Sequence, residues 1–246
     1  MALPDTLLIR LIETVQDFEL SGDFAMLGGQ RWLGSRRGKS AKRFRQTIEK
    51  RLPGLTEAEL HNPDNEYSER FFEKLGFSKV DSIDVSDFEG ASIILDLSKP
   101  VTRTKAPKFD VIYDGGTTEH VFDIATAWRN IDAMLKPGGV LIGHSPCNNW
   151  INHGFFQIGP EAVYGFWENA LGYEVLDLKL QPLRPDAIDR VATTTNPNET
   201  GSRPRIRGKL PAGIPTIIAY AVRKPSKSSA RGKDVYQTDY QRRWES

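Results

Sequence analysis

The sequence has few of the residues and segments that give proteins special stabilising or targeting chemistry. Cys147 is the only cysteine among 246 residues, which excludes an intramolecular disulfide and a zinc site built from several cysteines. No apolar run approaches the roughly 18 residues of a membrane-spanning helix. The first residues lack the basic, apolar and small-residue regions of a signal peptide. We therefore expect a soluble, cytoplasmic protein.

Excess charge of either sign is also absent. The 33 Lys and Arg residues nearly balance the 32 Asp and Glu residues, so the formal net charge is +1. A balanced chain has no general electrostatic attraction to nucleic acid or anionic lipid, and we expect neither as a partner. The length suits one large α/β domain with a substantial core.

The strongest structural pattern lies in residues 109–149. The apolar run FDVIY at 109–113 predicts a buried strand, and two glycines follow it at 115–116. LKPGG at 135–139 predicts a helix end, and 140–142 a second strand. Between them, apolar residues recur every three or four positions: Val121, Ile124, Ala125, Trp128, Ile131, Met134 and Leu135. Strand, helix and strand in this order predict a right-handed parallel βαβ unit.

Polar residues that can do chemistry follow both strands of this unit. They are Asp114, Glu119 and His120 after the first strand, and His144, Ser145 and Asn148 after the second. In open α/β sheets, ligands bind beyond the carboxyl ends of the strands. We therefore expect the functional site there.

The motifs FDVIYDGGTTEHV and LKPGG together resemble the second half of a class I S-adenosylmethionine-dependent methyltransferase. The continuation at 146–157 resembles a bacterial branch of that family tied to surface-sugar biosynthesis. The resemblance covers residues 23–224. It implies a doubly wound, Rossmann-like sheet of seven mostly parallel strands with helices on both faces, the last strand inserted antiparallel. It also implies S-adenosylmethionine as cofactor and a small or sugar-linked acceptor.

The resemblance also implies which residues hold the cofactor. Asp84, at the end of a strand at 79–85, would accept both ribose hydroxyls, which a carboxylate can do with its two oxygens. Asp96, after a strand at 91–95, would contact adenine, although both aspartates also suit ordinary turns. The remaining implied cofactor residues are Gly28 and Gly29 on the methionine side, and Asp114, Gly115 and His120 on the cofactor floor.

The glycine loop departs from the family's pattern. Met26 stands where the family has an acid, and Gly28, Gly29 and Gly34 do not reproduce the G-x-G-x-G spacing. This motivates an alternative hypothesis, a catalytically inactive, methyltransferase-like binding or scaffold protein. Residues 34–40 also resemble a phosphate-binding P-loop, but Leu33 stands where its first glycine is needed, so nucleotide hydrolysis is a third hypothesis.

Histidines are the natural candidates for a base, because their pKa lies near neutrality. We predict His144 and His153 as candidate catalytic bases and His120 as a residue on the cofactor side. With Asp114 and Glu119 they could also bind a metal, but no i, i+4 pair supports this, and the sequence predicts no metal.

The remaining segments are less specific. Residues 1–22 predict a helix that docks on the domain of residues 23–224, and residues 225–246 predict a polar, flexible tail. The tail's aromatic residues at every fourth position leave open a helix that docks on a partner. The helix of residues 1–22 leaves open a cover for the site or a dimer face, and hence a homo-oligomer. The basic residues of 31–51 suit a solvated helix face or a phosphate patch. Arginines in 179–215 would face an anionic acceptor unless this connection is disordered.

Overall fold

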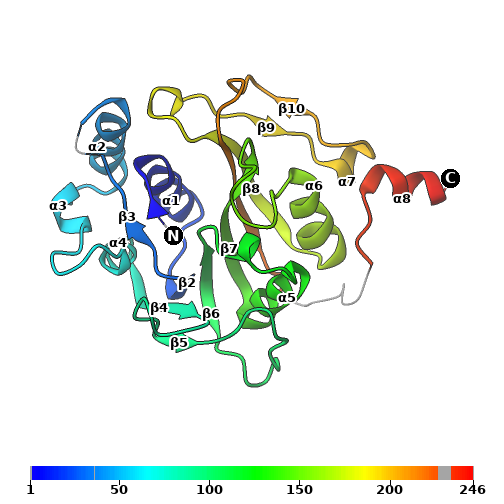
Figure 1. Cartoon of the computed structure of the whole chain (residues 1–246), viewed down its shortest axis with the longest axis horizontal. Helices are drawn as coiled ribbons and strands as arrows, with labels where there is room; N and C mark the ends of the chain where they lie inside the picture. The colour runs from blue at the N-terminus through cyan, green and yellow to red at the C-terminus, as the bar shows by residue number, and fades with distance from the viewer. Residues whose placement is uncertain (1, 36, 227–233, 246) are drawn as a thin grey trace.

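The computed structural model describes residues 2–35, 37–226 and 234–245. Its centre is a seven-stranded sheet with helices on both faces (Figure 1). From one edge to the other, the strands are β5 (Ile93–Ile94), β4 (Phe77–Asp84), β2 (Gly22–Leu27), β6 (Phe109–Asp114), β7 (Leu135–Asn148), β11 (Thr216–Arg223) and β8 (Glu174–Pro182). Neighbouring strands from β5 to β7 are parallel, whereas β11 runs antiparallel to β7 and β8. The predicted doubly wound fold with one antiparallel insertion is confirmed.

Helices cover the two faces of the sheet (Figure 1). One face carries α1 (Asp5–Asp17), α2 (Lys39–Arg51), the short α3 (Glu57–Leu60) and α4 (Glu69–Lys74). The other face carries α5 (Ile124–Met134), α6 (Pro160–Val163) and the π-helix η2 (Tyr164–Ala170).

The central strands are apolar because both of their faces are covered. In β2, Phe24 and Met26 pack in the cluster that includes α1, while Ala25 and Leu27 pack in the cluster that includes α5. Successive side chains of a strand point to opposite faces, so a strand between two helical layers needs an unbroken apolar run. This is why the short apolar runs in the sequence predicted buried strands correctly.

Strand β7 is longer than the sequence predicts. It begins at Leu135, includes the LKPGG residues and continues to Asn148, whereas the prediction placed a strand at 140–142 and a polar tip after it. Residue 144 therefore pairs with Ala219 of β11 inside the sheet. The predicted strand at 91–95 is reduced to the two residues of β5.

The long connection between β8 and β11 is structured. It contains η3 (Pro185–Ala187), the antiparallel pair β9 (Thr193–Thr194) and β10 (Ile206–Arg207), and α7 (Pro197–Thr200). A second small pair, β1 (Ala2–Leu3) with β3 (Arg31–Trp32), ties the N-terminal residues to the loop after β2. Residues 179–215 are therefore ordered, and the alternative of a disordered connection is wrong.

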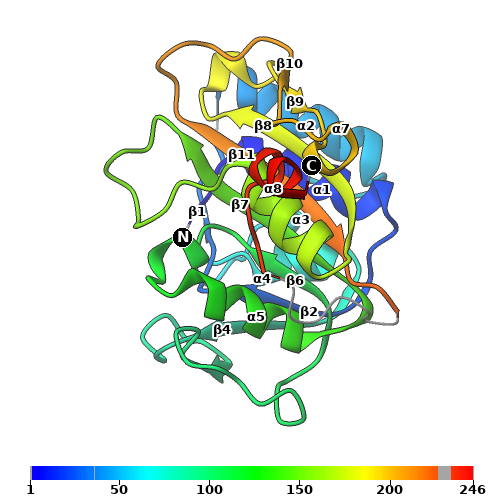
Figure 2. The ribbon, with the colours of Figure 1, turned by 90° about the vertical axis from the view of Figure 1, so that its right-hand side faces the viewer.

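Residues 238–245 form helix α8 (Thr238–Glu245) rather than an irregular tail. Figure 2 shows α8 beside the segment of α6 and η2, and the backbone N–H of Thr238 donates to Glu161 at 2.7 Å. The Arg242 guanidinium donates to the Asn198 carbonyl at 2.9 Å. The helix thus packs on its own chain. Residues 227–233 and 246 of the predicted flexible tail lie outside the described residues.

None of the helices in the described part of the chain combines the length and the apolar character that crossing a membrane requires.

A buried ion pair joins the end of β11 to α5. Asp132 and Lys224 each expose 6% of their side chains, and their charged groups lie 3.3 Å apart. Tyr173 donates to the same carboxylate at 2.9 Å, and Arg103 forms a further ion pair with it. The Lys224 ammonium also donates to the Leu135 carbonyl at 2.9 Å. Burial lowers the pKa of Lys224 and the nearby Asp132 opposes that shift.

Removing one partner of this pair should destabilise the fold strongly. Asp132→Ala leaves a buried ammonium without its counter-ion, which costs about 3–5 kcal/mol in comparable sites. Adding Lys224→Met removes the unpaired charge and should recover part of that loss. Urea unfolding of the two variants and the native chain measures this. An Asp132→Ala variant as stable as the native chain would contradict the interpretation.

Candidate functional site

Two cavities lie beyond the carboxyl ends of the parallel strands. The first, of about 360 Å³, lies between the ends of β4 and β5 and the 3₁₀ turn η1 (Thr118–His120). It brings together three predicted cofactor residues: Asp84, Asp96 and His120. The second, of about 650 Å³, contains predicted Gly115, His144 and His153, together with Glu119. Because Glu119 and His120 are adjacent in η1, the two cavities meet at this turn.

The loop after β2 forms a close wall next to the first cavity. Gly28 has a positive φ of 69°, which favours glycine, and a Cβ at this position would lie 3.2 Å from Thr117 Oγ1 and 3.7 Å from Asp84 Oδ2. A Cβ on Gly29 would lie 2.9 Å from the Tyr67 ring. The two predicted glycines are therefore required by close approach, even though their spacing is irregular.

Asp114 organises the turn that separates the cavities. Its carboxylate is fully buried and accepts hydrogen bonds from the backbone N–H groups of Thr117 at 2.8 Å and Thr118 at 3.3 Å. It also accepts from the Thr118 hydroxyl. Burial raises the pKa of Asp114 and these hydrogen bonds oppose the shift. The carboxylate predicted to contact the cofactor thus holds the turn itself.

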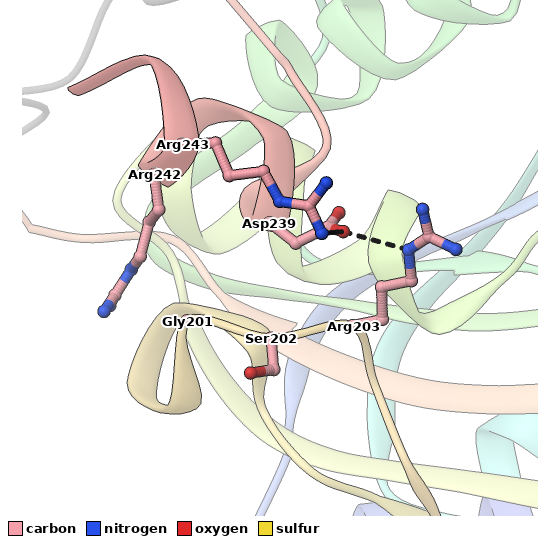
Figure 3. A pocket seen from close by; sticks show the side chains of 6 residues that line it. All are labelled: Gly201, Ser202, Arg203, Asp239, Arg242 and Arg243. Carbon is pink, nitrogen blue, oxygen red and sulfur yellow. Dashed lines mark hydrogen bonds and ion pairs between the residues drawn. The ribbon is translucent and has the colours of Figure 1, made fainter. Parts of the chain in front are cut away.

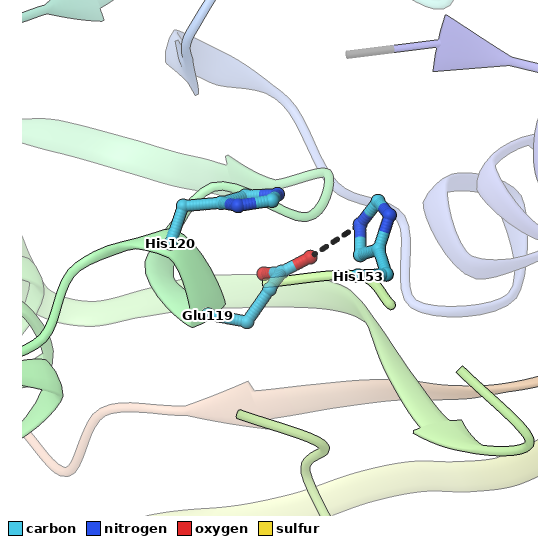
Figure 4. Close-up of side chains that lie close together, drawn as sticks. All are labelled: Glu119, His120 and His153. Atoms are coloured by element: carbon cyan, nitrogen blue, oxygen red, sulfur yellow. Dashed lines mark ion pairs between the residues drawn. The ribbon is translucent and has the colours of Figure 1, made fainter. Parts of the chain in front are cut away.

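Glu119 is the most unusual group of the site. Its side chain is fully buried, and within the described chain neither carboxylate oxygen has a hydrogen-bond partner. Burial, with a smaller effect of nearby Asp114, raises the pKa of Glu119 to about 8. Figure 4 shows the carboxylate between His120 and His153, and Oε1 lies 3.6 Å from His153 Nε2.

His153 is held near Glu119 by the loop after β7. The backbone N–H of Phe155 donates to the Glu119 carbonyl at 2.9 Å, so this loop packs directly on η1. Gly154 next to it has a positive φ of 66°, and a Cβ there would lie 3.0 Å from the Glu119 carbonyl oxygen. The His153 ring also packs edge-on against Trp150, with centroids 4.9 Å apart.

His144 lines the same cavity but, unlike His153, its side chain is almost completely buried. It is 1% exposed because β7 continues past it, and its Nδ1 lies 3.0 Å from the Tyr113 hydroxyl. Burial lowers the pKa of His144 to about 3. The ring is therefore neutral at pH 7, and a proton accepted there would be held weakly.

The two predicted aspartates of the first cavity, Asp84 and Asp96, differ in how many hydrogen bonds and ion pairs their carboxylates form. Asp84 Oδ1 accepts from the Val85 N–H at 2.6 Å, while Oδ2 lies toward Gly28. Asp96 accepts from Ser98 and pairs with Lys99 at 3.0 Å, and these contacts lower the pKa of Asp96 to about 2. Asp96 thus has a turn role in this structure.

The predicted basic surfaces are largely neutralised by acids. Lys39 and Arg43 pair with Asp189, and Arg51 pairs with Asp17. These pairs favour the solvated helix face over the phosphate patch, and they engage the lysine of the P-loop-like segment. Arg36 lies outside the described residues.

The arginines of 179–215 do not line the second cavity, so far as the described residues show. Arg184 pairs with Asp186, and Arg203 pairs with Asp239 at 3.0 Å. In Figure 3, Arg203 and Arg243 lie on either side of Asp239, in a separate pocket beside α8.

Two further residues at the site, Gln30 and Glu89, have no signal in the sequence. Gln30 is fully buried, its Nε2 donates to the Leu27 carbonyl at 3.0 Å, and its Oε1 lies against Gly115. Glu89 lines the second cavity beside Arg31. Their positions follow from the loops that enclose the cavity, whose shapes are not periodic.

No known family model matches the chain. Two curated relatives, ubiquinone biosynthesis O-methyltransferases from Brucella melitensis biotype 1 and biotype 2 strains, are each 27% identical over 128 residues. The match covers 47% of this chain and 52% of each relative, so the chain spans about half the length of the relatives it matches.

Solved structures resemble the chain weakly over most of its length. The N-methyltransferase NodS from Bradyrhizobium japonicum, in complex with S-adenosyl-L-homocysteine, has a TM-score of 0.41 and 14% identity, covering 88% of this chain and 85% of NodS. The [4+2]-cyclase SpnF has a TM-score of 0.46 and 14% identity, covering 90% and 81%. Similarity at this level does not assign an activity.

The buried neutral His144 should make stability depend on pH. The unfolded chain protonates this histidine near its ordinary pKa of 6.5, whereas the folded chain does so only at about 3. Stability from this group is therefore present above pH 6.5 and falls by up to about 1.4 kcal/mol per pH unit between 6.5 and 3. Urea unfolding should show a smaller pH slope for His144→Gln, which keeps a polar partner for Tyr113. Equal slopes would contradict a buried, neutral His144.

Proposed function

We propose that the chain transfers a methyl group from S-adenosylmethionine to a small acceptor. The observation that carries this proposal is the pair of cavities that meet at Glu119 and His120. The first cavity contains the Asp84 carboxylate and lies beside the glycine loop after β2, and the second contains the titratable groups of Glu119 and His153. The two relatives from Brucella melitensis are O-methyltransferases, which supports the reaction type. The weak structural likenesses carry none of this argument.

The first cavity fits the cofactor. Asp84 presents Oδ2 toward Gly28, and a side chain at Gly28 would fill the space between that oxygen and Thr117. Apolar Ile83, Leu95 and Val121 line the same cavity and suit a base ring. We propose that Asp84 holds the ribose hydroxyls and that Gly28 and Gly29 leave room for the methionine part. When bound, the cofactor would supply a methyl group on a positively charged sulfur, a good leaving group.

The second cavity would hold the acceptor. Its lining is largely apolar, from Leu7, Leu33, Leu183 and Ile217, and its polar groups include Glu119 and His153. This favours an acceptor with an apolar body and one nucleophilic oxygen or nitrogen. The chain's contribution is to align that atom and exclude water, which is the main requirement of a displacement with a good leaving group.

The finer assignments stay predictions. The sugar-linked acceptor rests on the sequence resemblance alone, and such a compound would fit this lining through its non-sugar part. For an anionic acceptor, the described lining offers one arginine and no lysine; this residue, Arg31, pairs with Glu66 and Glu89. A cytoplasmic location and a homo-oligomeric state also remain predictions.

Cofactor binding should depend on Asp84. Calorimetric titration with S-adenosylmethionine and S-adenosylhomocysteine should give dissociation constants of about 1 µM, which corresponds to a free energy of binding of roughly −8 kcal/mol. Asp84→Ala should weaken both by about tenfold or more, because ribose hydroxyls lose their acceptor. Asp87→Ala is the matched control, since it removes a carboxylate from the exposed turn next to β4.

Two outcomes would count against the proposal. If neither compound binds the native chain, the methyltransferase assignment fails, and a scaffold on the same fold becomes the better hypothesis. If both compounds bind and Asp84→Ala binds them as well as Asp87→Ala does, the ribose role of Asp84 is wrong.

A further inference from the structure

Three potential metal ligands from two segments converge where the cavities meet. Glu119 and His120 come from η1, and His153 comes from the loop after β7. One ligand atom from each lies within 4.8 Å of the other two. Figure 4 shows both imidazole rings beside the carboxylate, and the ring centroids of His120 and His153 are 4.9 Å apart.

Glu119 lacks the contacts that normally accompany a buried carboxylate. Buried polar groups are almost always hydrogen-bonded, and an unpaired buried carboxylate is costly. Both oxygens of Glu119 are buried without a hydrogen-bond partner within the described chain. Its distance of 3.6 Å to His153 Nε2 is too long for a hydrogen bond.

That distance does suit two atoms that bind the same ion. Oxygen and nitrogen ligands about 2.0–2.2 Å from a tetrahedral ion lie roughly 3.4 Å from each other. One ring nitrogen of His120 lies within 4.8 Å of both of these atoms, and His120 is exposed, which leaves room for its side chain to move toward the same point. Gly154 and the Phe155 hydrogen bond to Glu119 fix the His153 loop against η1, so two of the three ligands are held in place before an ion arrives.

We propose that Glu119, His120 and His153 bind one divalent transition-metal ion. Two imidazoles and one carboxylate are donors typical of Zn²⁺, Fe²⁺, Co²⁺ or Mn²⁺, whereas Mg²⁺ and Ca²⁺ prefer oxygen donors. Three protein ligands leave at least one coordination position for another molecule. Glu119 and His153 both line the second cavity, so that position faces the space proposed for the acceptor.

The role of the ion in the reaction rests on the proposed function, although its binding does not. An acceptor hydroxyl on the ion would lose its proton to solvent at neutral pH, because a divalent ion lowers the pKa of a bound hydroxyl. The oxygen's lone pair would then form the new bond to the methyl carbon. The carbon–sulfur bond would break with its electron pair remaining on sulfur, which becomes a neutral thioether.

Metal binding can be measured directly on the full chain without an affinity tag. After treatment with a chelator, the protein is titrated with Co²⁺, followed by visible absorption, and with Zn²⁺, followed by calorimetry. We expect one equivalent to bind, with the intense absorption of low-coordinate Co²⁺. Glu119→Gln and His153→Ala should each weaken binding by about tenfold or more. His61→Ala is the matched control, because it removes an exposed histidine that belongs to neither cavity lining.

The outcomes separate the metal site from the methyl-transfer proposal. Circular dichroism first establishes that each variant is folded. Absence of binding, or binding that Glu119→Gln and His153→Ala weaken no more than His61→Ala does, overturns the metal site. Titration of the chelated protein with S-adenosylhomocysteine tests the cofactor site on its own, because Asp84 is not a metal ligand. Loss of metal with retained cofactor binding would leave the proposed function standing.

Discussion

The hydrogen bonds of the Asp114 carboxylate are the interaction on which the rest of the site depends. They hold the backbone of Thr117 and Thr118 in one conformation directly after β6. Thr118 in turn accepts from the Trp128 indole at 3.1 Å, and Thr117 donates to the Leu27 carbonyl at 2.6 Å. One buried carboxylate therefore links β6, α5 and β2 and sets where η1 can lie.

This arrangement has an electrostatic consequence. Asp114 and Glu119 are both fully buried and close enough that the charge of Asp114 raises the pKa of Glu119. Asp114 has three hydrogen-bond donors that stabilise its charge, whereas Glu119 has none within the described chain. The nearby hydrogen-bond donors therefore bind Asp114, which has a structural role, and leave the carboxylate of Glu119 without hydrogen bonds from the described residues. Unsatisfied buried groups concentrate at functional sites because a ligand can complete them.

The sequence predicts the fold well and the site only in part, for physical reasons. Strand β2 and helix α5 were predictable because their burial imposes a period on the residues. His144 was placed at a strand tip because polar residues usually end a buried strand, but Tyr113 supplies a partner that lets the strand continue. The approach of His153 to Glu119 depends on the loop after β7, which has no period. Conversely, the irregular glycine spacing around Gly28 had suggested a damaged loop, whereas its positive φ and close contacts show an ordered wall.

The two histidines of the second cavity differ in what they can do, although the sequence predicted the same role for both. His144 is neutral, hydrogen-bonded and enclosed by β11, so taking up a proton would require charging a buried ring. His153 is partly exposed, with 36% of its side chain accessible, and lies beside Glu119, which accepts no hydrogen bond from the described residues. A group that binds an ion or moves a proton must change partners during the reaction. Among the described residues of this cavity, Glu119 and His153 have partners that are not already fixed by the fold, and they can therefore take such a role.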